Sequence, residues 1–75
     1  MKAQTIDIHG KNQVETEDLF MGYLNESRLK NEMKEVTFIT GVGVLQKKLK
    51  NMATEQGLEW HIPMSNPGCI VIYFE

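Results

Sequence analysis

The chain has 75 residues, a formal net charge of −2 at neutral pH and one cysteine. This length predicts a single domain, residues 1–75, with a thin core, because so short a chain buries only about 60–65% of its unfolded surface. The charge excludes a strongly basic protein, so contact with nucleic acid requires a local basic patch. With no disulfide framework, secretory signal or membrane span in the sequence, we expect a cytoplasmic, intracellular protein without a membrane partner.

The first half of the chain predicts a strand, a helix and a second strand. Residues 3–8 have the composition of a strand, which a glycine then ends. Asn12 and Glu15 have the spacing of a capping box, and the amphipathic stripe after them continues to about residue 30. Residues 35–40, EVTFIT, are β-branched and aromatic, which predicts the second strand.

The second half predicts a helix and two further strands. The helix covers about residues 44–56 and ends at a glycine. Residues 58–62, LEWHI, alternate between apolar and polar as a half-buried strand does, and His61 is interpreted as structural. Pro67-Gly68 predicts a turn before residues 69–74, whose continuous apolar run is typical of a central strand covered on both faces.

The order of these elements, βαβαββ, predicts the fold class. Alternation of strands and helices favours parallel pairing through right-handed crossovers. The last two strands have a short connection and are expected to pair in an antiparallel hairpin. We therefore expect a two-layer α/β (α+β) sandwich, with two helices packed on one four-stranded mixed sheet.

The stretch TIDIHG, residues 5–10, places an acid and an imidazole two positions apart. In a strand, Asp7 and His9 would share one face and stand about 7 Å apart along it. An aspartate and a histidine at the carboxyl end of a strand suit acid–base catalysis, and Asp7 also suits a divalent metal with its bound water. The alternative is structural: Asp7 accepts a hydrogen bond from a neighbouring backbone amide, and His9 forms the turn.

Residues 40–43, TGVG, connect the second strand to the second helix. The backbone N–H groups of Thr40, Gly41, Val42 and Gly43 would face the helix N-terminus, which stabilises a bound phosphate. Glycines also let a ligand approach the backbone closely. The loop lacks the third glycine of a dinucleotide fingerprint and the Gly-Lys-Ser/Thr of a P-loop, and an ordinary turn is the alternative.

Four lysines lie close to these two segments in the sequence. Lys11 follows His9, while Lys47, Lys48 and Lys50 belong to the first part of the second helix. If the first two strands are neighbours, both loops open at one edge of the sheet, and the lysines add a basic rim that suits nucleic acid. The alternative is an ordinary solvated helix face.

The segments IDIHG, NQVE and FITGVGVLQKKLKNMA, followed by a terminal apolar strand, resemble the small MutS-related (Smr) domain over nearly the whole chain. The resemblance implies an α/β sandwich similar to the C-terminal domain of translation initiation factor three. It also implies an endonuclease that nicks or cleaves DNA or RNA. Asp7 and His9 match the acidic and basic positions of the family's first motif, and Thr40, Gly41 and Gly43 match its glycine loop.

The leading hypothesis is therefore a nucleic-acid-binding, Smr-like endonuclease. The loop amides, Lys47 and Lys48 would hold a phosphate. Asp7 would activate a water, a ribose hydroxyl or a water bound to Mg²⁺ or Mn²⁺, and His9 would protonate the leaving oxygen. Thr40 stands where many family members have a second histidine, which favours the alternative of a non-catalytic module that recognises nucleic-acid structure or a larger protein partner.

Overall fold

The computed structural model describes residues 2–75, and for Lys2 the backbone alone. Within this range, four strands and two helices follow one another in the predicted order. They are β1 (Lys2–Asp7), α1 (Gln13–Lys30), β2 (Lys34–Ile39), α2 (Val44–Glu55), β3 (Glu59–His61) and β4 (Cys69–Phe74). The predicted bounds differ from these only by single residues at the ends of elements.

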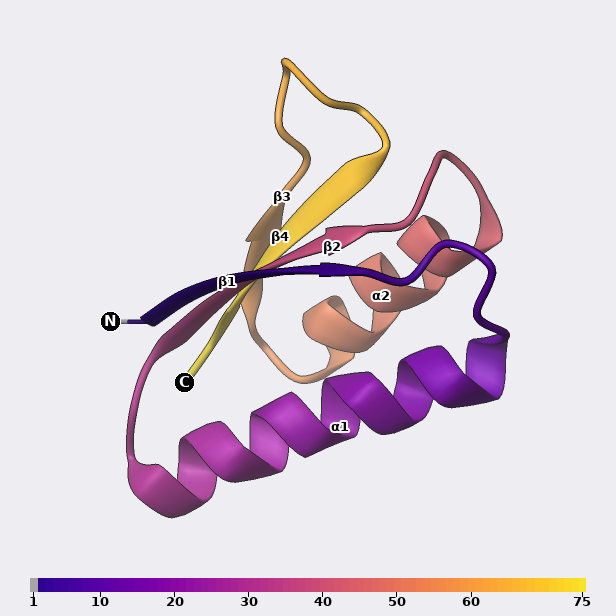
Figure 1. Ribbon diagram of the computed structural model, residues 1–75. Helices are drawn as coiled ribbons and strands as arrows, with labels where there is room; N and C mark the ends of the chain where they lie inside the picture. The colour runs from indigo at the N-terminus through magenta and orange to yellow at the C-terminus, as the bar shows by residue number, and fades with distance from the viewer. Residues whose placement is uncertain (1) are drawn as a thin grey trace.

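The four strands form one mixed sheet in the order β1-β2-β4-β3 (Figure 1). β1 and β2 are parallel, since the chain returns through α1 between them, and β4 is antiparallel to both of its neighbours. The predicted fold class, a βαβαββ sandwich with two helices on a mixed sheet, is confirmed. The expected antiparallel pairing of the last two strands is confirmed as well.

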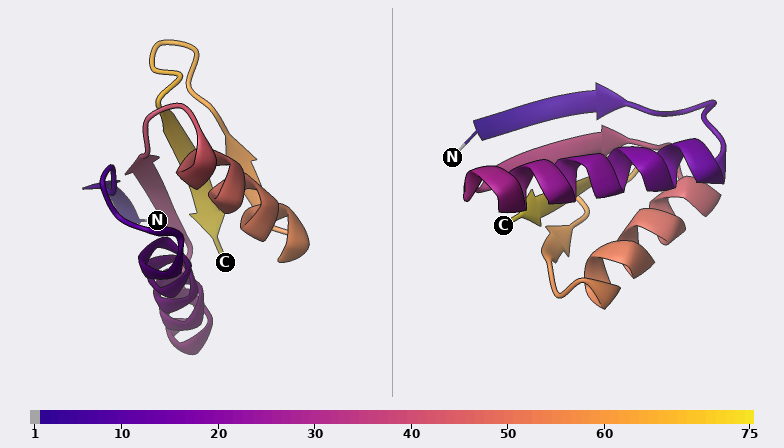
Figure 2. Two further views of the ribbon diagram at one scale, coloured as in Figure 1. Left: turned by 90° about the vertical axis from the view of Figure 1, so that its right-hand side faces the viewer. Right: turned by 90° about the horizontal axis from the view of Figure 1, so that it is seen from below.

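Both helices pack on one face of the sheet, and the opposite face has no helix over it (Figure 2). The sequence predicted that residues 69–74 form a central strand with both faces covered. β4 is indeed central, between β2 and β3, but only one of its faces lies under the helices. On the other face, Cys69 and Val71 are nevertheless only 4% and 6% exposed. The apolar run therefore contains side chains that are buried on both faces of β4, although the helices cover only one of these faces.

The helix α1 is fixed at both ends by local hydrogen bonds. The Glu15 N–H donates to the Asn12 side chain (2.8 Å), and the Asn12 N–H donates to the Glu15 carboxylate (3.1 Å), which confirms the predicted capping box. At the other end Asn31 adopts a left-handed conformation, and its N–H donates to the carbonyls of Arg28 and Ser27. Within residues 2–75, no helix is both long enough and apolar enough to cross a membrane.

The core lies between the covered face of the sheet and the two helices. Phe74 is its centre, with ring centroids 5.2 Å from Phe20 and 6.3 Å from Phe38 in tilted and edge-on arrangements. Around these rings pack the other buried apolar side chains, which are Ile8, Leu24, Val36, Leu49, Ala53, Leu58, Ile70 and Ile72. These contacts hold the sheet to the helices and so fix where the loops at its edges stand.

Two leucines of α1 test this packing. Leu24→Ala removes a fully buried side chain, and we expect it to lower the free energy of unfolding by about 2–5 kcal/mol. Leu29→Ala makes the same change at a side chain that is 86% exposed, and should alter stability by less than about 0.5 kcal/mol. Urea denaturation followed by circular dichroism measures both, and equal losses would contradict the described core.

Candidate functional site

The loops after β1 and β2 lie together at one edge of the molecule. The two strands are parallel neighbours, and beyond their last paired residues the Ile8 N–H still donates to the Ile39 carbonyl (3.0 Å). Figure 1 shows both loops on the right, beside the N-termini of α1 and α2. We call this region, residues 7–12 and 40–46, the loop rim.

Within the loop rim, Asp7 and His9 contact each other directly. The His9 Nδ1 atom lies 2.5 Å from Asp7 Oδ1, and the same oxygen accepts the His9 backbone N–H at 3.1 Å. Both side chains are open to solvent, with 50% of Asp7 and 73% of His9 exposed. The backbone hydrogen bond is the one that the structural alternative predicted, and the imidazole contact accompanies it.

The direct contact corrects the expected separation of about 7 Å between these side chains. That separation assumed an extended backbone from Asp7 to His9, whereas β1 ends at Asp7. The chain then turns, with Gly10 at φ 86° and the Lys11 N–H donating to the Ile8 carbonyl (3.0 Å). The turn carries the imidazole back onto the carboxylate.

The contact with His9 sets the electrostatics of Asp7. The hydrogen bond with the imidazole and then that from the backbone amide hold the pKa of the Asp7 carboxyl below its ordinary value of 3.8. A carboxylate on Nδ1 also fixes the tautomer of a neutral imidazole and leaves Nε2 available to accept a proton. Within residues 2–75, no hydrogen bond engages the Nε2 atom of His9.

The glycine loop is held by the turn before β4. The N–H groups of Thr40 and Gly41 both donate to the Gly68 carbonyl at 2.9 Å, and the Thr40 hydroxyl donates to the Gly41 carbonyl at 2.6 Å. This corrects the predicted set of phosphate donors, because the amides of Thr40 and Gly41 are already engaged within the protein. Gly41 has φ 72°, so the glycine supports the shape of the loop.

The start of α2 supplies a different set of donors. Its cap residue, Gly43, has no side chain and makes no side-chain capping bond, and its first turn contains no acidic residue. Within residues 2–75, no side-chain cap therefore engages the backbone N–H groups of Val44, Leu45 and Gln46, which lie at the positive end of the helix dipole. In α1, by contrast, the N–H of the third helical residue, Glu15, donates to the Asn12 side chain.

Gln46 is a part of the site that sequence reasoning missed. Its side-chain amide donates to the carbonyls of Pro67 (2.8 Å) and Cys69 (3.0 Å), and thereby ties the first turn of α2 to the start of β4. The turn at Pro67-Gly68 was predicted, but a glutamine in a helix gives no local signal of a partner some twenty residues away.

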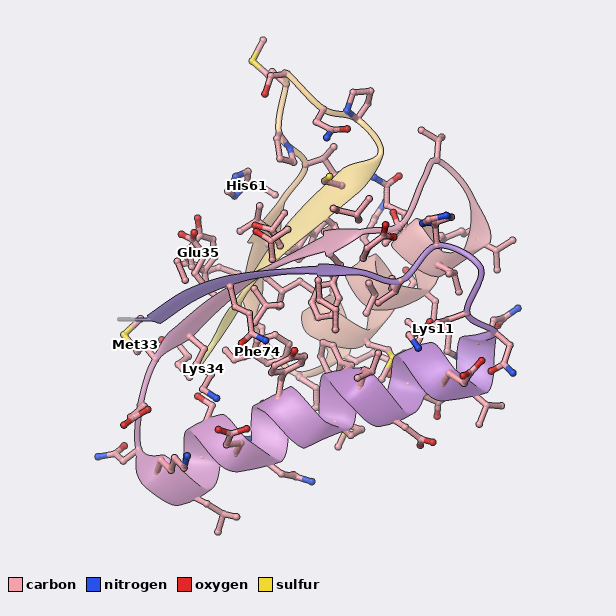
Figure 3. The ribbon with its side chains drawn as sticks, in the orientation of Figure 1. Lys11, Met33, Lys34, Glu35, His61 and Phe74 are labelled. Atoms are coloured by element: carbon pink, nitrogen blue, oxygen red, sulfur yellow. The ribbon has the colours of Figure 1, made fainter. Side chains whose placement is uncertain are left out.

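The predicted lysines do not form one basic rim, and the ammonium group of Lys50 lies 5.6 Å from the centre of the Trp60 ring. Lys48 pairs with Glu17 of α1 at 3.0 Å, so its charge is partly neutralised. Figure 3 shows Lys11 directed back along α1, on the helix side of the sheet. Lys47 is exposed next to the uncapped first turn of α2, and it is the lysine best placed to contact a phosphate there.

An open groove of about 430 Å³ separates the start of α1 from α2. It contains both positive and negative side chains, so its charges largely balance. Its lining residues are Gln13, Glu17, Val44, Lys47, Lys48, Asn51, Met52 and Glu55.

The side chains present do not form a cage for Mg²⁺ or Mn²⁺. Within residues 2–75, there is no group of three or more His, Cys, Asp or Glu side chains that could hold a metal ion. Asp7 is the one predicted ligand, and its Oδ1 atom already accepts two hydrogen bonds from His9.

Comparison of the chain with protein-family models, with curated proteins and with solved structures gave no match. The resemblance to the Smr domain thus stays a prediction from the quoted motifs.

Removing the imidazole tests the electrostatics of the Asp7–His9 pair. We expect His9→Ala to raise the pKa of the Asp7 carboxyl toward 3.8, and His61→Ala, a matched change on β3, to leave it unaltered. Because the folded-state pKa is lowered, the pair stabilises the protein above the ordinary carboxyl pKa, and this contribution is lost as the pH falls through the lowered value. A carbon-detected NMR titration measures the pKa, and an unchanged value in His9→Ala would contradict the contact.

Proposed function

We propose that this protein is a nucleic-acid-binding domain that cleaves phosphodiester bonds of DNA or RNA at the loop rim. The observation that carries the proposal is the 2.5 Å contact between Asp7 Oδ1 and His9 Nδ1 on two solvent-exposed side chains. An imidazole oriented by a carboxylate is a general acid–base group, because its free nitrogen can accept and return a proton near neutral pH.

In the proposed reaction the two residues act as one unit. Asp7 holds the imidazole through Nδ1, and His9 Nε2 removes the proton from the attacking hydroxyl of water or ribose. The oxygen attacks phosphorus, the bond to the leaving oxygen breaks, and the imidazolium returns its proton to that oxygen. Asp7 is thus a positioning residue, which revises its predicted role as the base that activates the nucleophile directly.

The phosphate would bind at the uncapped start of α2. The N–H groups of Val44 and Leu45 offer donors at the positive end of the helix, and Lys47 adds a full charge beside them. The parallel pairing of β1 and β2 brings this helix start to the same edge as His9. A bound phosphodiester and the acid–base group would therefore meet at the loop rim.

A second function, binding without cleavage, is favoured by Thr40. Its hydroxyl is buried and donates to the carbonyls of Gly41 and Gly68, so it does not supply the second acid–base group that a histidine at this position would provide. With one imidazole, the same group has to serve both proton transfers. A non-catalytic module would need only the uncapped helix and its lysine.

Cleavage assays with labelled RNA and with supercoiled DNA, each with EDTA or with Mg²⁺, separate the two functions. We expect products from the native chain and a loss of at least about a hundredfold in rate for His9→Gln, the range typical of a general acid–base group. His61→Gln is the matched control, since it removes the other histidine, on β3, and should cleave at the native rate. If the native chain binds nucleic acid in a salt-sensitive way but gives no cleavage products, the nuclease function is rejected and the binding module is retained.

Two neighbouring lysines of α2 test the phosphate site. Lys47→Gln should weaken nucleic-acid binding and reduce the slope of log affinity against log salt by about one, as expected for one lost phosphate contact. Lys48→Gln removes the same charge from a lysine that is paired with Glu17, and should have the smaller effect. Fluorescence anisotropy over a salt series measures both slopes, and a larger effect of Lys48→Gln would place the phosphate elsewhere.

A further inference from the structure

The uncovered face of the sheet is a surface that the proposed nuclease does not use, apart from Asp7 at its edge. Alternate strand residues point to it, opposite to those that point into the core. We call this surface the open sheet face. It consists of Ala3, Thr5 and Asp7 of β1, Glu35, Thr37 and Ile39 of β2, Glu59 and His61 of β3, and Cys69, Val71 and Tyr73 of β4.

The open sheet face is acidic. Its members include three carboxylates, those of Asp7, Glu35 and Glu59, and among its described side chains there is no lysine or arginine. Lys34 of β2 lies on the other side of the sheet, where its ammonium group is 2.6 Å from Glu26 of α1. The open sheet face therefore carries negative charge with no described lysine or arginine to balance it.

An aromatic pair lies among these carboxylates. The rings of His61 and Tyr73 stack with centroids 5.8 Å apart and 28° between their planes. Glu35 and Glu59 are the direct cross-strand partners of Tyr73 on either side, so a carboxylate flanks the tyrosine on each neighbouring strand. Figure 3 shows Glu35 and His61 on the side of the sheet that faces away from the helices.

The two glutamates influence Tyr73 directly. Burial first, then the charge and the hydrogen bond of Glu35, and then the charge of Glu59 raise the pKa of the Tyr73 hydroxyl above 10.0. The phenol therefore stays neutral, and its ring is a flat, uncharged surface between two anionic groups. A planar cation that stacks on such a ring can reach carboxylates at its edges.

We propose that the open sheet face binds an arginine-containing basic segment of a partner protein, with one guanidinium group between Glu35 and Glu59, on the face of the Tyr73 ring that His61 does not cover. Guanidinium stacks on aromatic rings and donates in its own plane to carboxylates, which the compact ammonium of lysine cannot do in the same way. The negative charge of the open sheet face favours a basic partner. A second copy of this face would bring carboxylates against carboxylates, and a nucleic-acid backbone would meet the same repulsion.

This inference is independent of the proposed nuclease. Tyr73, Glu35 and Glu59 lie toward the end of the sheet remote from the loop rim, since Glu35 is near the start of β2 and the loop rim follows its end. Loss of peptide binding in variants of these residues should leave cleavage unchanged. Failure of either proposal can thus be distinguished from failure of the other.

A labelled synthetic peptide that alternates arginine with serine is the probe, with its lysine counterpart as the comparison. We expect the native chain to bind the arginine peptide at low ionic strength, and the double variant Glu35→Gln/Glu59→Gln to bind about tenfold more weakly. The matched control is Asp18→Asn/Glu55→Gln, which removes two charges from exposed positions on α1 and α2 and should stay within about twofold. Circular dichroism confirms that each variant folds.

Changes at Tyr73 test the stacking. Tyr73→Leu should abolish the preference for arginine over lysine, and Tyr73→Phe, which keeps the ring, should retain it. Equal weakening in the control double variant, absence of arginine-peptide binding to the native chain, or equal affinity for the lysine peptide would each overturn the proposal. The proposal would also be overturned if RNA or a raised protein concentration, but not the peptide, shifted the NMR signals of Glu35, Glu59 and Tyr73.

Discussion

The parallel pairing of β1 with β2 is the constraint on which the rest of the structure depends. Parallel neighbours have their carboxyl ends at the same edge, so the chain has to leave both strands there and enter both helices there. The hydrogen bond from Ile8 to Ile39 continues this pairing into the loops. The contact of Asp7 with His9 at the end of β1 and the start of α2 after β2 therefore lie at the same edge of the sheet.

A second constraint is the small size of the core. A chain of 75 residues has two helices, and both are used to cover one face of the sheet. The other face has to remain stable without a covering helix, and on it Cys69 and Val71 are buried among neighbouring strand residues that are mostly polar or aromatic.

Much of the fold was predictable from local signals. The capping box of Asn12 and Glu15 gave the start of α1 because capping depends on side chains three residues apart. The β-branched and apolar runs gave the strands, and the alternation of strand and helix gave the parallel pair. The direct contact of Asp7 with His9 was not predictable, since it required knowledge of where β1 ends and how the backbone turns at Gly10.

The sequence by itself determined the element order, the fold class and the presence of an acid, an imidazole and a glycine loop next to strand ends, because these depend on composition and short spacings. Only the tertiary structure decided which backbone amides remain free. Gly68 engages those of Thr40 and Gly41, and Glu17 pairs with Lys48, through partners distant in the chain. The physical reason is that packing decides which groups come within hydrogen-bonding or ion-pairing distance of each other. A short stretch of sequence contains no information about a partner that lies far away in the chain.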